Sequence, residues 1–158
     1  MTFRYSSETG AVRARIDGQE LAVLSAVPPL LASVDGDTAD PAHDRLYPTA
    51  YANEADDREF RRLSRGEIQR GRRRDRDHLA AVLARLRDGR TELTTDEAEA
   101  CARAVGAARL VIAARHGMFD GDGLPDVPTS PHEAIVAYLG MVQDELVDAL
   151  LQTPAMQT

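Results

Sequence analysis

The chain has 158 residues, enough for one domain with its own core, and 43% of them are hydrophobic, as in globular proteins. It contains no Trp, four Tyr and three Phe, so Leu, Val, Ala and Ile must fill most of the core, which suits a helical bundle. The formal net charge of −7 argues against a surface that attracts nucleic acid everywhere, and we expect a single domain over residues 1–158.

The N-terminal segment has the pattern of a β-hairpin over residues 3–16. Its two short strands, 3–6 and 11–16, flank a turn at residues 8–10, and apolar residues alternate with arginines in the second strand. Residues 91–94 could add a third strand to this hairpin. We therefore expect a small antiparallel sheet of two or three strands.

Five helices are predicted from apolar periodicity and capping signals, at about residues 18–33, 54–63, 65–88, 95–116 and 131–151. Four of them begin with a capping box, in which an Asp, Ser or Thr is followed three residues later by Glu, at Asp17, Ser64, Thr94 and Ser130. Pro28-Pro29 predicts a kink in the first helix or its division into two short helices. These elements predict an α+β fold that is predominantly α-helical, a helical bundle with a small antiparallel sheet from the N-terminal hairpin.

The helix at 95–116 is predicted to be the central one. Its apolar residues recur at steps of four, three and four, at Cys101, Val105, Ala108 and Ile112. Small residues along this stripe let neighbouring helices approach closely. The last helix carries its own core stripe at Ile135, Tyr138, Leu139, Val142, Leu146 and Leu150.

An apolar and aromatic cluster, RLYPTAY, occupies residues 45–51 and follows an acidic loop at residues 33–44. Loops seldom carry such clusters unless the side chains pack on the core or on a partner. Both placements stay open, and packing on the core is the favoured interpretation.

Charge is distributed unevenly along the chain. All 19 basic residues are Arg, and residues 61–90 hold eleven of them against four acidic residues, so this segment carries +7 and the remainder −14. The helix at 65–88 has an apolar stripe in its second half, but extending that stripe backward reaches Asp75, Arg72 and Ile68. Either Asp75 and Arg72 pair at the surface, or this half of the helix projects beyond the core.

Three hypotheses explain the basic segment. It is a solvated and ion-paired helix face, a docking surface for an acidic protein, or a contact surface for nucleic-acid phosphates. The candidate surface residues are Arg65, Arg70, Arg72, Arg73, Arg74 and Arg76. The acidic remainder of the chain would weaken the long-range attraction of nucleic acid.

The sequence carries no motif of an enzyme, a metal site or a cofactor site. The run at residues 120–123, DGDG, begins like a calcium loop, but Leu124 and Pro125 stand where such a loop needs an oxygen ligand and a glycine. The four histidines are far apart and lack the spacing of a zinc site. We therefore expect a non-enzymatic protein that uses neither a cofactor nor a metal.

Cys101 is the only cysteine, so one chain can form neither an intramolecular disulfide nor a CxxC redox site. Its place on the apolar stripe predicts an unreactive core thiol, and a redox role is the alternative. The sequence has no run of about 18 apolar residues and no charged-then-apolar leader, so we expect no membrane contact and a cytoplasmic location.

Three parts of the chain together resemble an actinobacterial family catalogued as a domain of unknown function. They are residues 45–51 followed by 59–63, the sequence Arg109-Leu110-Val111-Ile112, and residues 138–144. The family includes an oxidative-stress-responsive transcriptional regulator. The resemblance covers nearly the whole chain in order, and it implies a cytosolic, non-enzymatic regulator that partners a stress sigma factor and affects cysteine-biosynthesis genes.

One departure from the family's regulator concerns its redox switch. That regulator forms an intramolecular disulfide within a CxxxC pair, whereas here Cys101 is followed at this spacing by Val105. The resemblance therefore implies the regulatory class without this switch. Any response to oxidant would need an intermolecular disulfide or another oxidised form of Cys101. Homodimerisation and direct DNA binding through the arginine-rich helix stay open.

Overall fold

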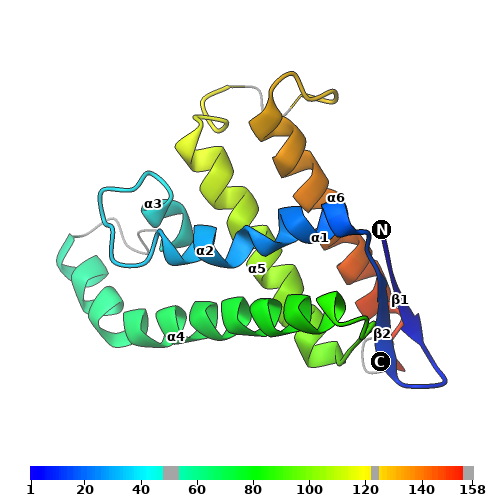
Figure 1. Ribbon diagram of the computed structural model, residues 1–158. Helices are drawn as coiled ribbons and strands as arrows, with labels where there is room; N and C mark the ends of the chain where they lie inside the picture. The colour runs from blue at the N-terminus through cyan, green and yellow to red at the C-terminus, as the bar shows by residue number, and fades with distance from the viewer. Residues whose placement is uncertain (48–53, 122–124, 155–158) are drawn as a thin grey trace.

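The computed structural model describes residues 1–47, 54–121 and 125–154 (Figure 1). Within these ranges the chain forms six helices and one three-stranded antiparallel sheet. The predicted α+β class with mostly helical structure is confirmed. Figure 1 shows α5 in the middle of the helices, with the sheet at one side of the molecule.

The sheet has the strand order β1-β2-β3. β1 (Thr2–Ser6) pairs antiparallel with β2 (Ala11–Arg15), which pairs antiparallel with β3 (Glu92–Leu93). Phe3 and Val12 are buried and belong to the hydrophobic core. The predicted hairpin and its third strand are confirmed.

Two short helices follow the hairpin, α1 (Gly18–Ser25) and α2 (Val27–Ala32). α1 starts at the predicted capping box, because the Glu20 N–H donates to the Asp17 carboxylate at 2.8 Å and the Asp17 N–H donates to the Glu20 carboxylate at 2.9 Å. The proline pair lies in the first turn of α2, where a helix needs no backbone donor. The predicted division of this segment is therefore confirmed.

The sequence did not predict α3 (His43–Leu46), a short helix that includes the first two residues of the apolar cluster at 45–51. His43 and Leu46 are buried, and Tyr47 is partly buried against the core. Leu46 and Tyr47 of the cluster thus pack on the core, as favoured from the sequence, whereas Arg45 is exposed. Residues 48–51 of that cluster lie outside the described residues.

α4 (Glu54–Arg87) is one continuous helix, so the predicted pair of helices at 54–63 and 65–88 is wrong. Ser64 and Glu67 have capping-box spacing, but such a cap forms only where the chain before it leaves helical angles. Residues 54–63 contain no proline and are mostly good helix formers, and Gly66 costs a helix only about 1 kcal/mol relative to Ala. The helix therefore continues through Ser64, and its N-terminal half extends past α5 (Figure 1).

α5 (Thr95–Arg115) is the central helix and packs against α2, α3, α4 and α6. Its predicted capping box is present, with the Glu97 N–H donating to Thr94 at 3.1 Å and the Thr94 N–H donating to Glu97 at 2.9 Å. Seven of its alanines are buried and let several neighbours approach the backbone: Ala98, Ala100, Ala102, Ala104, Ala107, Ala108 and Ala113.

α6 (Pro131–Leu151) returns along α5 in the opposite direction and also packs on β1 (Figure 1). Leu139 and Leu146 are buried, as predicted. Ile135 was expected in the same stripe but is 38% exposed, and Val136 is buried instead. Val136 and Ile135 lie three and four residues before Leu139, so both have helical spacing to it, and spacing alone does not decide which of them is covered.

Candidate functional site

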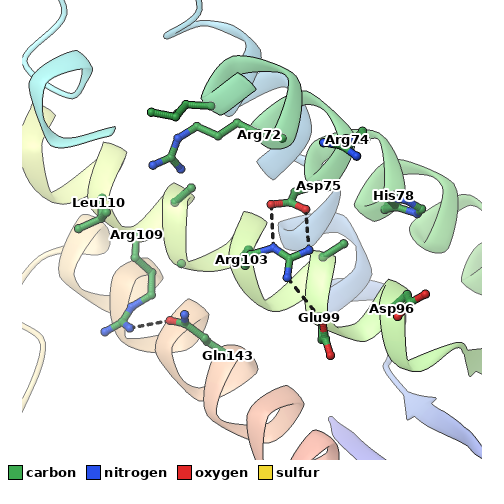
Figure 2. Close-up of a pocket in the computed structure, with 15 residues that line it drawn as sticks. Arg72, Arg74, Asp75, His78, Asp96, Glu99, Arg103, Arg109, Leu110 and Gln143 are labelled. Atoms are coloured by element: carbon green, nitrogen blue, oxygen red, sulfur yellow. Dashed lines mark hydrogen bonds and ion pairs between the residues drawn. The ribbon is translucent and has the colours of Figure 1, made fainter. Parts of the chain in front are cut away.

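A groove of about 890 Å³ lies along the side of α5 between α4 and α6 (Figure 2). Its lining comes from the three helices: Ile68, Gly71, Arg72, Arg74, Asp75 and His78 from α4; Asp96, Glu99, Ala100, Arg103, Gly106, Ala107, Arg109 and Leu110 from α5; and Gln143 from α6. The groove contains two of the arginines singled out from the sequence and both interrupting residues of the α4 stripe. In this groove the polar residues that interrupt the stripe of α4 therefore lie beside residues of α5 and α6.

Asp75 and Arg103 form the ion pair at the middle of the groove. Arg103 Nε and Nη2 each donate to one carboxylate oxygen of Asp75 at 3.0 Å, and Arg103 also lies 3.6 Å from Glu99. The hydrogen bonds to Asp75 raise the pKa of Arg103 above its usual value. This ion pair explains why a carboxylate interrupts the apolar stripe of α4. Asp75 pairs with Arg103 on α5 and not with Arg72 on its own helix.

Arg72 and Arg76 hold other parts of the chain against α4. Arg72 donates to the carbonyl oxygen of Leu46 at 2.9 Å, and its guanidinium carbon lies 5.5 Å from the centre of the Tyr47 ring. Arg76 donates to the Asp35 carboxylate at 2.8 Å. These two candidate surface residues are half-buried and have structural contacts, so they are not available as a simple binding face.

Arg70, Arg73 and Arg74 are exposed on α4, and we call these three residues the arginine face. Arg73 reaches within 3.9 Å of Asp35, and its side chain is 57% exposed. Arg70 and Arg74 make no ion pair with the part of the chain that the structure describes. Arg65 belongs to α4, but its side chain lies outside the described part. The five candidates with described side chains thus divide into two structural contacts and an exposed face of three.

Charged side chains line the groove from both α4 and α5. Figure 2 shows Arg72, Arg109 and Leu110 toward one end. His78 and Asp96 lie toward the other end, with Glu99 on the same side of Arg103. The charges do not separate by end, because the exposed Arg74 lines the same groove on the His78 side of Asp75 and Glu99 lies 3.6 Å from Arg103.

The crossing of α5 and α6 beside the groove depends on two glycines. A Cβ atom at Gly106 would lie 2.6 Å from Gln143 Nε2, and one at Gly140 would lie 3.2 Å from Arg109 Nη2. The missing side chains leave room for Arg109, which donates to Gln143 Oε1 at 3.0 Å. Sequence reasoning missed this contact, although two glycines in the interiors of predicted helices are a signal of close approach.

Cys101 lies in the core and not in the groove. Its side chain is 3% exposed, beside Leu24, Val105 and Leu146 around a small apolar cavity. Burial raises the pKa of the Cys101 thiol to about 12, and the nearby Glu97 carboxylate adds to the increase. The thiolate, which is the nucleophile in oxidation and exchange, is therefore scarce at neutral pH.

We expect the folded protein to react with a soluble thiol reagent at least about a hundredfold more slowly than free cysteine at pH 7, because thiolate fraction and access both fall. The measurement is the rate of absorbance change with an aromatic disulfide reagent. Protein unfolded in urea is the control and should react at the rate of free cysteine. Equal rates for folded and unfolded protein would show that Cys101 is accessible.

Other kinds of site receive little support from the described residues. Groups of three or more His, Cys, Asp or Glu placed to hold a metal ion do not occur among them. His116 and His132 stack with ring centres 3.5 Å apart, at the facing ends of α5 and α6. Within the described part of the chain, no helix is both long and apolar enough to cross a bilayer.

Comparison with known protein families finds a match. A family model described as Domain of unknown function (DUF2017) matches residues 2–150, nearly the whole chain. No curated protein and no solved structure matches the chain. The match supports the domain-of-unknown-function part of the predicted resemblance.

Proposed function

Because the chain belongs to the DUF2017 family, whose function is unknown, we propose from its surface that it is a regulator that binds a partner protein and performs no catalysis. The proposal is that it acts in the cytoplasm, in transcription under stress. Residues 45–51, 59–63, 109–112 and 138–144 resemble a family that includes AosR, an oxidative-stress-responsive regulator that partners a sigma factor, and this resemblance supports this class of function.

The observation that carries the proposal is the arginine face of α4. Arg70 and Arg74 are exposed without an ion pair in the described chain, while Arg72 and Arg76 on the same helix are bonded to Leu46 and Asp35. Three exposed guanidinium groups on a helix that runs past its neighbour suit the carboxylates of an acidic partner. The partner class that fits is therefore a protein with an acidic docking surface.

A non-catalytic role is supported by the ionisable groups at the middle of the groove. Asp75 and Arg103 satisfy each other with two hydrogen bonds, and the pKa of Arg103 is raised further from neutrality. General acids and bases work best with pKa values near the working pH. An arginine that is held in its charged form stabilises structure better than it transfers protons.

The proposal includes no disulfide switch within one chain. Cys101 is buried, and Val105 occupies the position of the second cysteine in a CxxxC pair. Partner binding through α4 requires neither residue to react. The protein can thus belong to a stress response as a component that binds, with the oxidant detected elsewhere.

The test is a pull-down with the full chain in which Arg70→Glu, Arg73→Glu and Arg74→Glu are combined. Three reversed charges should lower recovery of the partner from a lysate of the source cells by at least about tenfold, because attraction becomes repulsion. Partner bands are compared by quantitative mass spectrometry. The matched control reverses three exposed arginines outside α4, Arg4, Arg15 and Arg90, and should leave recovery unchanged. Equal recovery with both triple variants would remove the arginine face from consideration.

Direct DNA binding is the second candidate function, favoured by the same exposed Arg70 and Arg74. Phosphate contacts would make the affinity fall steeply with salt. The net charge of −7 opposes this alternative, because most of the molecule would repel a duplex. If labelled duplex DNA shows no binding at low salt, the alternative fails and the protein-binding proposal stands.

A further inference from the structure

Two half-buried arginines of the groove lack a carboxylate partner. Among the side chains that the structure describes, five arginines are half-buried: Arg72, Arg76, Arg85, Arg109 and Arg115. Three of these form an ion pair, in the pairs Arg76–Asp35, Arg85–Glu97 and Arg115–Asp40. Arg72 and Arg109 form none with the described residues, and both of them line the groove.

The acceptors that hold Arg72 and Arg109 are neutral. Arg72 donates from Nη2 to the Leu46 carbonyl oxygen at 2.9 Å, and Arg109 donates from Nη1 to Gln143 Oε1 at 3.0 Å. These bonds orient the guanidinium groups but leave their positive charges without a counter-charge. A half-buried ion has lost part of its hydration, so it is unfavourable until an opposite charge approaches. An anion bound beside these two arginines would remove that cost.

Each of the two guanidinium groups also has unused donors. Within the described chain, Arg72 Nη1 and Arg109 Nη2 donate to no acceptor. The Nε atoms of both residues are buried and lack an acceptor as well. Native proteins satisfy the great majority of their buried donors, so two such arginines in one groove require an explanation. Because the Nε atoms are covered, a ligand would be held by the Nη nitrogens.

The position of Arg109 is fixed by α6. A Cβ atom at Gly140 would lie 3.2 Å from Arg109 Nη2 and 3.3 Å from its guanidinium carbon, so the absence of a side chain gives this group its place. Gln143, on the next turn of α6, holds Nη1. The helix therefore positions a cation without supplying a carboxylate to it. Such pre-organisation favours ligand binding, because less conformational freedom is lost when the ligand arrives.

The carboxylates of the groove form no ion pair with these two arginines. Asp75 accepts two hydrogen bonds from Arg103, and Glu99 lies 3.6 Å from the same arginine. Figure 2 shows Asp96 beyond Arg103, on the side away from Arg72 and Arg109. Among the described residues, the negative charges that line the groove thus lie elsewhere or are already paired.

We propose that the groove binds a small organic anion whose carboxylate or phosphate oxygens accept hydrogen bonds from Arg109 Nη2 and Arg72 Nη1. The guanidinium group suits both kinds of oxyanion. The groove volume of about 890 Å³ lies in the range of small-molecule sites. Ile68 and Leu110, which are 37% and 38% exposed, offer apolar surface to the carbon skeleton of the ligand. The inference goes beyond the proposed partner binding and does not depend on it.

The test is an NMR titration of the full chain, labelled with ¹⁵N, using sodium phosphate and sodium malonate as probes. Sodium chloride keeps the ionic strength constant, so general screening does not change. The backbone amide signals of Gly106, Leu110 and Gly140 should shift and reach saturation, whereas that of Gly10 in the hairpin turn should stay in place. The probe that saturates the signals at the lower concentration identifies phosphate or carboxylate as the preferred group. A lack of saturation with both probes, or an equal shift at Gly10, would overturn the proposal.

Arginine variants test which residues hold the probe. Arg109→Gln and Arg72→Gln should each weaken binding of the preferred probe by at least about tenfold, because each removes a charge and its hydrogen bonds. Arg90→Gln is the matched control, since it removes the same charge from an exposed residue that does not line the groove, and it should bind like the parent. The dispersion of the amide signals shows whether each variant is folded. Equal affinities of Arg109→Gln and Arg90→Gln would exclude this site even if the parent binds a probe.

Discussion

Replacing Leu146 by alanine is expected to lower the free energy of unfolding by about 3 kcal/mol. Leu146 is 1% exposed on α6, at the place where α6 packs on both α5 and β1. It lines a small apolar cavity with Phe3, Leu24 and Cys101, so removing three carbon atoms would enlarge an existing gap in a region that already joins sheet and helices. The loss combines reduced burial with the cost of a larger cavity.

The measurement is a urea unfolding curve followed by circular dichroism. With a urea dependence of about 2 kcal/mol per molar, the midpoint should fall by about 1.5 M. Leu151→Ala is the control on the same helix, because Leu151 is 52% exposed, and its midpoint should move by less than about 0.3 M. Similar midpoints for the two variants would mean that Leu146 does not join the sheet to the helices as described.

Replacing Arg115 by alanine should lower the free energy of unfolding by about 2 kcal/mol. Arg115 at the end of α5 donates from Nε to Asp40 Oδ2 at 3.1 Å and from Nη2 to Ser33 at 2.8 Å. The Asp40 side chain is 6% exposed and is covered in part by Arg115 itself. In the variant this carboxylate still accepts a hydrogen bond from the Ala42 N–H, and water can enter the space that Arg115 leaves. The loss of unfolding free energy is therefore smaller than for a deeply buried ion pair.

The stability difference should depend on pH. The hydrogen bond from Arg115 lowers the pKa of Asp40 below its ordinary value of 3.8, although burial of the carboxyl opposes this shift. A carboxyl with a lowered folded pKa stabilises the fold fully above its unfolded pKa, and that contribution is lost as the pH falls through the folded pKa. The parent and Arg115→Ala should therefore differ most near neutral pH and converge below about pH 3.8 in urea curves.

Arg103→Ala is the matched control for this prediction. Arg103 also makes two hydrogen bonds to one carboxylate, but its side chain is 58% exposed, against 29% for Arg115. Solvent screening should hold the cost of Arg103→Ala below about 1 kcal/mol. A larger loss for Arg103→Ala than for Arg115→Ala would show that burial does not rank these two ion pairs.

Helix starts could be predicted from the sequence where the residues of the cap alone determine the start of the helix. Asp17, Thr94 and Ser130 each begin a helix because the residue before the helix has extended angles and the Glu three residues later reaches back. The same spacing at Ser64 gave a wrong prediction, because it does not reveal whether the preceding chain is already helical. The break in α4 was therefore predicted from a pattern whose meaning depends on residues outside it.

The sequence indicated the α4 residues of the candidate site but not their partners on other elements. The interruption of the α4 stripe at Asp75 and Arg72 showed that this half of the helix does not pack on an ordinary core. Their partners, Arg103 and the Leu46 carbonyl, lie 28 and 26 residues away, and only tertiary packing brings them close. The basic segment therefore predicted a surface, whereas the groove required knowledge of how α4 crosses α5.

The burial of Cys101 makes the protein convenient for site-specific spectroscopy. A maleimide dye or a nitroxide should leave the folded chain unlabelled, so the native cysteine need not be removed before a new one is introduced. Leu110→Cys would place one reactive sulfur on the wall of the groove, where Leu110 is 38% exposed. A fluorophore at this position would report directly, through its emission and its mobility, whether a partner protein enters the groove.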